Sequence, residues 1–354
     1  MFEVLRWLVI ALGVSMVAGT LASFSRSPHW LIRGWDFPRI HIGAVAAISA
    51  LLYLAFFFTG RWIETALLAM LAACAAWQIY KILPYTRIAP RRVKACGPGP
   101  RDESFRLVAS NVLMDNREFD QFRKVIGEAD PDLILLLETD ERWIAELNDL
   151  KASHPYTVLQ PQDNMYGMAL FSRLPLIDSE VRFLIQDDIP SIRTDVELPC
   201  GLTFRLHCLH PRPPEPVRDQ DSKPRDAELV IVGREIAKAD LPTMVAGDLN
   251  DVAWSATSEL FLRISGLLDP RMGRGLYNTF SAKTSLLRFP LDHVFHSNCF
   301  ELVDLRRLGD VGSDHFPMLI ELCYKPEAQS EQPETEERAG DAEEAQEKVQ
   351  KASK

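Results

Sequence analysis

The sequence predicts an α+β sandwich, in which two β-sheets pack together with helices outside, preceded by three membrane-spanning helices. Three observations lead to this prediction. Long apolar stretches open the chain, strand and helix patterns alternate in the region that follows, and many short strand patterns succeed one another after that. A mixture of this kind favours sheets whose outer faces are covered by helices.

The first region, 1–83, is predicted to be a membrane anchor. The stretches 7–24 and 42–60 contain no charged residue, and 62–80 contains only Glu64. A helix rises about 1.5 Å per residue, so each stretch can just cross a hydrocarbon core roughly 30 Å thick. A cleaved signal peptide remains an alternative for 7–24, because small residues lie near its end; two spans would then be left.

The Lys and Arg residues around these stretches predict which side of the membrane the rest of the chain faces. The N-terminus and the turn at 60–62 would share one side and hold Arg6 and Arg61. The other side would hold Arg26, Arg33, Arg39, Lys81, Arg87, Arg91, Arg92 and Lys94. Because basic loops stay in the cytoplasm, this count favours a cytoplasmic location for the region after the anchor.

The cysteines and the charge distribution exclude several classes of protein. Cys96, Cys200, Cys208, Cys299 and Cys323 are scattered without a recognisable spacing, which argues against a small disulfide-stapled scaffold and agrees with a reducing compartment. Residues 1–96 carry a net charge of +7, 97–325 carry −12 and 326–354 carry −5. A dedicated non-specific nucleic-acid binder normally has a basic domain, so the charge distribution argues against this class of protein.

Two segments are predicted to lack packed structure of their own. Residues 84–103 are rich in Pro, Gly and Arg and are expected to form a linker whose arginines could touch anionic lipid head groups. Residues 326–354 contain no aromatic residue and almost no aliphatic ones. Such a segment cannot bury enough apolar area to offset its ordering entropy, so a disordered acidic tail is expected.

The region between them, 104–325, is predicted to be the catalytic domain. Short apolar runs bounded by turn residues predict strands at 105–113, 132–137, 156–160, 167–172, 179–185, 193–198, 202–209, 242–247, 291–296, 300–305 and 316–323. Apolar residues at helical spacing predict helices at 117–128, 142–150, 226–238 and 255–264.

Polar residues stand at the ends of several of these strands. Glu138 follows five aliphatic residues, Asn111 closes the first strand, and Asp248 and Asn250 follow another. Asn or Asp at a strand end is more often a turn or cap residue, so each position alone is weak.

Two further acidic positions strengthen the pattern. Asp292 stands in an apolar strand, where a carboxylate is costly unless it is paired or metal-bound, and Asp314–His315 precedes the last strand. Five such positions in one region predict a site rather than five unrelated caps.

The chemistry of these side chains predicts a hard divalent cation and acid–base groups. The oxygen ligands Asn111, Glu138 and Asp314 suit Mg²⁺ or Mn²⁺, whereas zinc would call for closely spaced His or Cys. No Walker loop, dinucleotide fingerprint or GxSxG elbow is present in the sequence. His210 and His315, with Asp248 and Asp292, could then transfer protons and contact phosphate.

At this point the chain resembles the endonuclease/exonuclease/phosphatase superfamily over roughly 104–324. The motifs occur in the order of that family. They are Ser110-Asn111-Val112, Leu137-Glu138-Thr139, the run 166–173, Leu209-His210-Pro211, Gly247-Asp248-Leu249-Asn250, Leu291-Asp292-His293 and Ser313-Asp314-His315. With three preceding spans, the chain looks like a bacterial membrane-anchored branch, which implies a multi-pass protein of the inner (cytoplasmic) membrane.

The resemblance implies a four-layer αββα sandwich of the deoxyribonuclease-like kind and a role for each site residue. Glu138 would be the principal metal ligand, with Asn111 and Asp314 nearby. Asp248 would position and deprotonate the attacking water, and Asn250 would hold that water or a phosphate oxygen. His315, oriented by Asp292, and His210 would contact the phosphate. One departure is Leu113, which stands where some nuclease branches carry an acid.

These observations predict a membrane-anchored, magnesium-dependent hydrolase of phosphodiesters or phosphomonoesters that uses direct attack of water. The net charge favours a small or lipid-linked substrate over a polyanion. A nuclease acting on DNA or RNA and a non-catalytic binding protein on the same fold remain alternatives. His293, which follows Asp292 and faces the opposite side of the strand, is expected to be structural.

Overall fold

A computed structural model describes residues 1–97, 101–215 and 220–352 of the chain. The predicted linker includes 98–100 and the predicted tail includes 353–354, which lie outside the described residues. Two compact units are present. One comprises residues 1–89 with 214–222, and the other comprises 90–213 with 223–354.

The first unit contains three long apolar helices, α1 (Phe2–Ala22), α3 (Arg39–Phe56) and α4 (Trp62–Ile82). Within the described part of the chain these three are long and apolar enough to cross a membrane, as the sequence predicts. They pack together through Ile42, Ala46 and Leu71, while many large apolar side chains point outward. A helix hydrophobic on its outer surface needs an apolar environment, which lipid would supply.

The second unit begins with a mixed sheet of six strands. The strand order is β10 (Phe300–Arg307), β11 (Met318–Tyr324), β1 (Ser104–Asn111), β2 (Leu133–Leu137), β4 (Met168–Ser172) and β3 (Tyr156–Gln160). Strands β1 and β2 are parallel, and the other pairs are antiparallel. The carboxyl ends of β1 and β2 therefore lie at the same edge of this sheet.

A second sheet of five strands faces the first. Its order is β5 (Leu176–Arg182), β6 (Ser191–Glu197), β7 (Thr203–Leu209), β8 (Thr243–Asp248) and β9 (Asp292–His296). Only β7 and β8 are parallel among these pairs. In β6 and β7, apolar residues stand at every second or fourth position, and Ile192, Val196, Phe204 and Leu206 point toward the other sheet.

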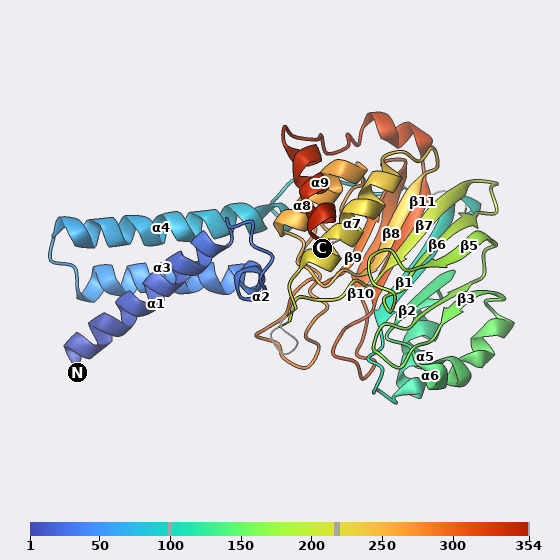
Figure 1. Ribbon diagram of the computed structural model, residues 1–354, viewed down its shortest axis with the longest axis horizontal. Coiled ribbons are helices and arrows are strands. Elements are labelled where there is room, and N and C mark those ends of the chain that lie inside the picture. Colours follow the sequence, from blue (N-terminus) through green and yellow to red (C-terminus); the bar gives the residue numbers. More distant parts are fainter. Residues whose placement is uncertain (98–100, 216–219, 353–354) are drawn as a thin grey trace. The chain divides into compact units, whose positions relative to one another are not determined.

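Helices cover the outer faces of both sheets, so this unit has four layers (Figure 1). Leu107 and Leu135 of the first sheet meet Leu206 and Met244 of the second in a continuous core. Helices α5 (Phe119–Ala129) and α6 (Glu141–Glu146) pack on the outer face of the first sheet. Helices α7 (Lys223–Ile236) and α8 (Ala256–Ser265) pack on the second. The predicted αββα sandwich is confirmed, with each predicted strand and helix within a few residues of its expected bounds.

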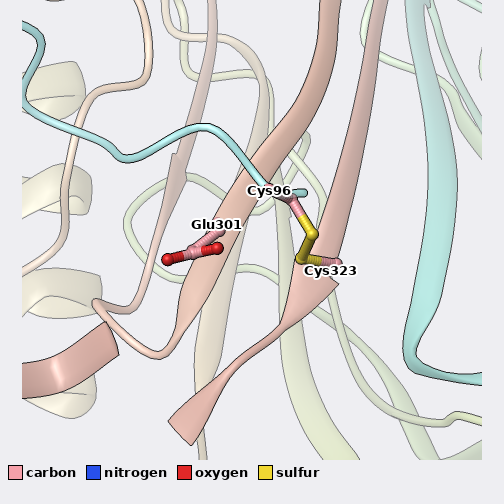
Figure 2. A group of neighbouring side chains, drawn as sticks. All are labelled: Cys96, Glu301 and Cys323. Carbon is pink, nitrogen blue, oxygen red and sulfur yellow. A yellow bond between two sulfur atoms is a disulfide. The ribbon is translucent and has the colours of Figure 1, made fainter. Parts of the chain in front are cut away.

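The segment predicted as a linker instead joins the second unit from residue 90 onward. Val93 is fully buried in the core between the sheets, and the backbone of 94–96 pairs with Leu302 in β10. Figure 2 shows Cys96 joined to Cys323 of β11 by a disulfide across 227 residues of sequence, beside Glu301. The scattered spacing of the cysteines agreed with a reducing compartment and marks no pair, because this disulfide depends on tertiary docking and not on local spacing.

The prediction of a disordered tail was also wrong. Residues 326–330 form a short 3₁₀ helix, and Asp341–Ala352 forms the helix α9. Ala345 of α9 is buried against Val230 of α7 and Leu260 of α8. The carboxylate of Asp341 accepts two hydrogen bonds from Arg263, at 2.7 and 2.9 Å. Helix α9 is held by a narrow face of small residues and by specific ion pairs. Disorder was predicted from the low apolar content of the tail, and contacts of this kind form without a high apolar content.

Candidate active site

The predicted site residues come together where the carboxyl ends of strands from both sheets meet. Asn111 is the last residue of β1, and Glu138 follows the last residue of the parallel strand β2. The Nδ2 atom of Asn111 donates to Oε1 of Glu138 at 2.8 Å and to Oδ2 of Asp248 at 3.2 Å. Asp248 is the last residue of β8, so the amide of Asn111 joins the two sheets at this edge.

His315 lies between two carboxylates. Its Nδ1 atom is 2.8 Å from Oδ2 of Asp292, and its Nε2 atom is 3.5 Å from Oδ2 of Asp248. All three side chains are buried. Their ligand atoms lie within 4.8 Å of one another, which is close enough to hold a metal ion. An imidazolium between the two carboxylates would offset half of their negative charge.

His210 and Asn250 complete the surroundings of Asp248. The Nε2 atom of His210 is 3.8 Å from Oδ2 of Asp248, and its ring packs against Tyr166 with centroids 5.2 Å apart. The backbone N–H of Asn250 donates to Oδ1 of Asp248 at 2.9 Å. Asp248 is therefore contacted on one carboxylate oxygen by its own loop and on the other by Asn111.

Backbone conformation at the site is unusual for the residues that occupy it. Glu138 has φ of 63°, Asn250 has 51° and Leu113 has 60°, all in the left-handed region. Non-glycine residues rarely adopt this region, and such positions concentrate at functional sites. Gly247 has φ of 144°, and a Cβ atom there would stand 2.0 Å from the carbonyl oxygen of Leu209. Only glycine lets β8 approach β7 this closely and place Asp248.

Burial and neighbouring charges shift the titration of these groups. Burial raises the pKa of Asp248 to about 7 and lowers the pKa of His210 to about 3. Burial also lowers the pKa of His315, but the carboxylates of Asp292 and Asp248 outweigh it and raise that pKa to about 10. Burial raises the pKa of Glu138 as well, and the nearby charge of Asp314 adds to this effect. The site thus contains carboxylates that a bound cation would stabilise.

Comparisons with known proteins assign the family. The model of the Endonuclease/Exonuclease/phosphatase family matches residues 108–315, which is more than half of the chain. The chain belongs to the endonuclease/exonuclease/phosphatase family. Members of this family are phosphodiesterase or nuclease hydrolases and are generally dependent on divalent metals. No sequence among curated proteins matches the chain.

Several solved structures share the fold of this chain. D. rerio TDP2 complexed with single strand DNA product has 18% identity and a TM-score of 0.52, over 62% of this chain and 98% of that one. The human Nocturnin catalytic domain with bound sulfate anion has 17% identity and a TM-score of 0.52, over 67% and 97%. An endonuclease/exonuclease/phosphatase from Beutenbergia cavernae has 18% identity and a TM-score of 0.51, over 63% and 72%.

The residues predicted as metal ligands fit a hard divalent cation. Glu138 and Asp314 are partly exposed carboxylates, and they are close enough for the charge of Asp314 to raise the pKa of Glu138. A cation between them would relieve this repulsion, and carboxylate oxygens are the ligands that Mg²⁺ and Mn²⁺ prefer. Asn111 is a weaker candidate, because its Oδ1 atom accepts a hydrogen bond from the backbone N–H of Leu113 at 3.1 Å.

Hydrogen bonds and close charged contacts connect seven of the eight predicted site residues, and Asp314 is linked to them through its charge. Their individual roles remain predictions. Sequence reasoning missed the residues that support them. Phe280 packs against the ring of His315 with centroids 5.0 Å apart, and Oγ of Ser313 donates to the carbonyl of Asn111 at 2.8 Å. Phe280 stands in a segment without a strand or helix pattern, so no sequence signal marks it.

Proposed function

We propose that this protein is a divalent-metal-dependent phosphoesterase that hydrolyses its substrate by direct attack of water. One observation carries the proposal. The carboxylate of Asp248 lies within reach of Asn111, His210 and His315 at once, at distances between 3.2 and 3.8 Å. A buried carboxylate surrounded by an amide and two imidazoles is suited to orient a water molecule and to accept its proton.

The remaining side chains would act on the phosphate. His315 is held by Asp292 on one ring nitrogen, which leaves Nε2 directed toward Asp248 and the reacting group. Positive charge and oriented N–H donors stabilise the charge that develops on phosphate oxygens in the transition state. His210 would supply a second imidazole donor, and Asn250 would orient the water or one phosphate oxygen. A divalent cation bound by Glu138 and Asp314 would supply further positive charge to the phosphate.

The proposed substrate is a small or lipid-linked phosphoester. Residues 97–325 carry a net charge of −12, which would repel a polyanion beyond the immediate site. Arg212 stands over the ring of Tyr166 beside His210, but its guanidinium is paired with Asp188 at 2.5 Å. A cation committed to an internal partner contributes less to the binding of a nucleic-acid backbone.

Hydrolysis of bis(4-nitrophenyl) phosphate by the purified full-length chain tests the reaction. We expect activity with Mg²⁺ or Mn²⁺, loss of activity with chelator, and a loss of at least about a hundredfold in kcat for Glu138→Gln. Glu141→Gln is a matched control, because Glu141 is exposed at the start of α6 only three residues away. Hydrolysis that survives both chelation and Glu138→Gln would contradict the assignment, and absence of hydrolysis in the wild type would favour a binding protein.

The alternative function is a nuclease, which the likeness to D. rerio TDP2 complexed with single strand DNA product supports. A panel of phospholipids, inositol phosphates, single-stranded DNA and RNA separates the two. Preference for a phospholipid with little dependence on salt would support the lipid-linked substrate. Preference for nucleic acid with activity that falls steeply as salt rises would support the nuclease.

We also propose that α1, α3 and α4 anchor the protein in a bacterial cytoplasmic membrane. The sequence-based count of Lys and Arg favours a cytoplasmic catalytic unit. However, Arg91, Arg92 and Lys94 belong to the second unit, and large folded domains cross membranes with little regard to such charges. The disulfide between Cys96 and Cys323 supports the opposite orientation, because disulfides persist in oxidising compartments. We therefore propose that the catalytic unit faces the outside of that membrane.

A further inference from the structure

A fully buried arginine, Arg225, lies behind the loop that carries Asn250. It belongs to the first turns of α7, and its guanidinium is surrounded by acids. The Nε and Nη2 atoms donate to Oδ1 of Asp226 at 3.1 and 2.9 Å, and Nη2 is 3.2 Å from Oδ2 of Asp251. The remaining nitrogen, Nη1, donates to the backbone carbonyl of Asn250 at 2.8 Å.

A second buried arginine, Arg271, holds the strand that carries Asp292 in a similar way. It lies between α8 and β9, and Nε and Nη2 donate to the carboxylate of Asp269 at 3.0 and 2.7 Å. Its Nη1 atom donates to the backbone carbonyl of Asp292 at 3.4 Å. Each arginine thus combines an acidic partner with the backbone carbonyl of one predicted site residue.

His293 connects the two arginines. Arg271 Nη2 lies 2.7 Å from Nδ1 of His293, and Nε2 of His293 lies 2.8 Å from the carbonyl oxygen of Asp251. A guanidinium can only donate, so Nδ1 accepts and the proton of the imidazole resides on Nε2. The expectation that His293 faces away from the reacting groups agrees with these contacts. Hydrogen bonds and one ion pair, which meet at Asp251, therefore link Asp269 to Asp226 behind the site.

Stability alone does not explain such a chain. Burying a guanidinium and a carboxylate costs several kcal/mol for each ion, and apolar pairs of similar volume are often as stable. What an apolar pair lacks is a directed donor for a backbone carbonyl. The backbone of Asn250 has a positive φ, which few residues adopt without support. Asp292 must present its carboxylate to His315. Both residues therefore need a fixed main-chain position.

We infer that Arg225 and Arg271 are positioning residues, which fix the backbone of Asn250 and of Asp292 for the hydrolytic reaction. This inference rests on the proposed function. Neither arginine touches the reacting groups; each acts through the residue whose carbonyl it holds. Loss of either should lower kcat more than it raises KM, because misplacement by a fraction of an ångström weakens contacts made in the transition state.

The first test replaces the Arg271–Asp269 pair by a neutral one. In Arg271→Met with Asp269→Asn, no unpaired charge is left behind, and the amide at 269 can still accept the backbone N–H of residue 271, as the carboxylate does now at 2.9 Å. The matched control is Arg205→Met with Asp195→Asn. In the wild type, Nε and Nη2 of Arg205 in β7 donate to the carboxylate of Asp195 in β6 at 2.8 and 3.0 Å, and this double variant removes both hydrogen bonds. Both double variants are made in the full chain, and kcat is measured per folded molecule after the folded fraction is determined from thermal melts.

We expect kcat on bis(4-nitrophenyl) phosphate to fall about ten- to a hundredfold in the first double variant and to stay near wild type in the control. KM should change less than about threefold. Equal kcat in the two double variants would overturn the inference. A first double variant that does not fold would also overturn it, because it would make the pair a stability element. An inactive wild type would instead contradict the proposed function.

The second test asks whether Arg225 acts through Asn250. Arg225→Lys keeps the charge but loses the forked geometry that reaches both the acids and the carbonyl. We expect it to lower kcat about tenfold in the wild-type background and in Asp292→Ala, but to have no further effect in Asn250→Ala. The same loss in both variant backgrounds would show a general effect on the fold and overturn the assignment for Arg225.

Discussion

The disulfide between Cys96 and Cys323 gives a prediction about both stability and location. It closes a loop across 227 residues of sequence and ties the segment after the anchor to the last strand of the sandwich. In the chain-entropy description, a loop of this length loses enough unfolded-state entropy to stabilise the folded unit by at most ~5 kcal/mol. For a unit of this size, that corresponds to a fall of about 10–20 °C in Tm when the bond is removed.

Thermal unfolding of the full-length protein with and without reductant measures this effect. Cys96→Ser and Cys323→Ser should each lower Tm to the reduced wild-type value, and reductant should change neither variant further. Cys200→Ser is a suitable control, because Cys200 is exposed and unpaired. Maleimide labelling then reports location. Protein taken directly from cells is denatured and labelled with maleimide, before and after treatment with reductant. We expect four thiols to react without reductant and two more to react after reduction. Labelling of every cysteine without reductant would refute both the disulfide and the outward orientation.

Three further predictions concern stability and catalysis. Burial raises the pKa of Glu228 from 4.5 to about 8, so the folded state loses stability as pH rises from 4.5 toward 8. The free energy of unfolding of Glu228→Gln, measured with denaturant, should match that of wild type at pH 4.5 and exceed it by up to ~3 kcal/mol at pH 7. A difference that stays constant with pH would contradict this. Trp143→Ala empties a buried site beside Phe119 and should cost about 3–5 kcal/mol while kcat per folded molecule is unchanged; a fall in kcat would contradict its structural role. Asp292→Asn should lower kcat at least about a hundredfold with little change in Tm, because an amide orients His315 less well; wild-type turnover in this variant would exclude the role.

Local patterns predict the sandwich because they report which residues are buried. The run 133–137 is fully buried and was recognised as a strand from its aliphatic residues alone, and α5 follows from Phe119, Phe122 and Ile126 at helical spacing. The same patterns place Glu138 and Asn111 at strand ends. That these ends meet follows from the parallel pairing of β1 and β2, which the structure shows and the local patterns do not specify.

Features that depend on docking between distant segments leave no such pattern. Helix α9 is held by Asp341 and Lys348, whose partners Arg263 and Asp226 stand more than 70 residues away. Residues 90–97 look like a linker by composition, yet one small apolar side chain, Val93, fills a space in the core. Arg225 and Arg271 are likewise unremarkable in sequence, because an arginine is usually exposed and only its surroundings reveal that it is buried.

Turnover by Asp248→Asn tests the central claim most directly. The change keeps the shape of the side chain and the hydrogen bond from the N–H of Asn250, but it removes the group that would accept the proton of water. We predict that hydrolysis of bis(4-nitrophenyl) phosphate falls by at least about a thousandfold while Tm stays close to wild type. Asp120→Asn, the same substitution at an exposed position on α5, should hydrolyse at the wild-type rate. Equal turnover in the two variants would contradict the account.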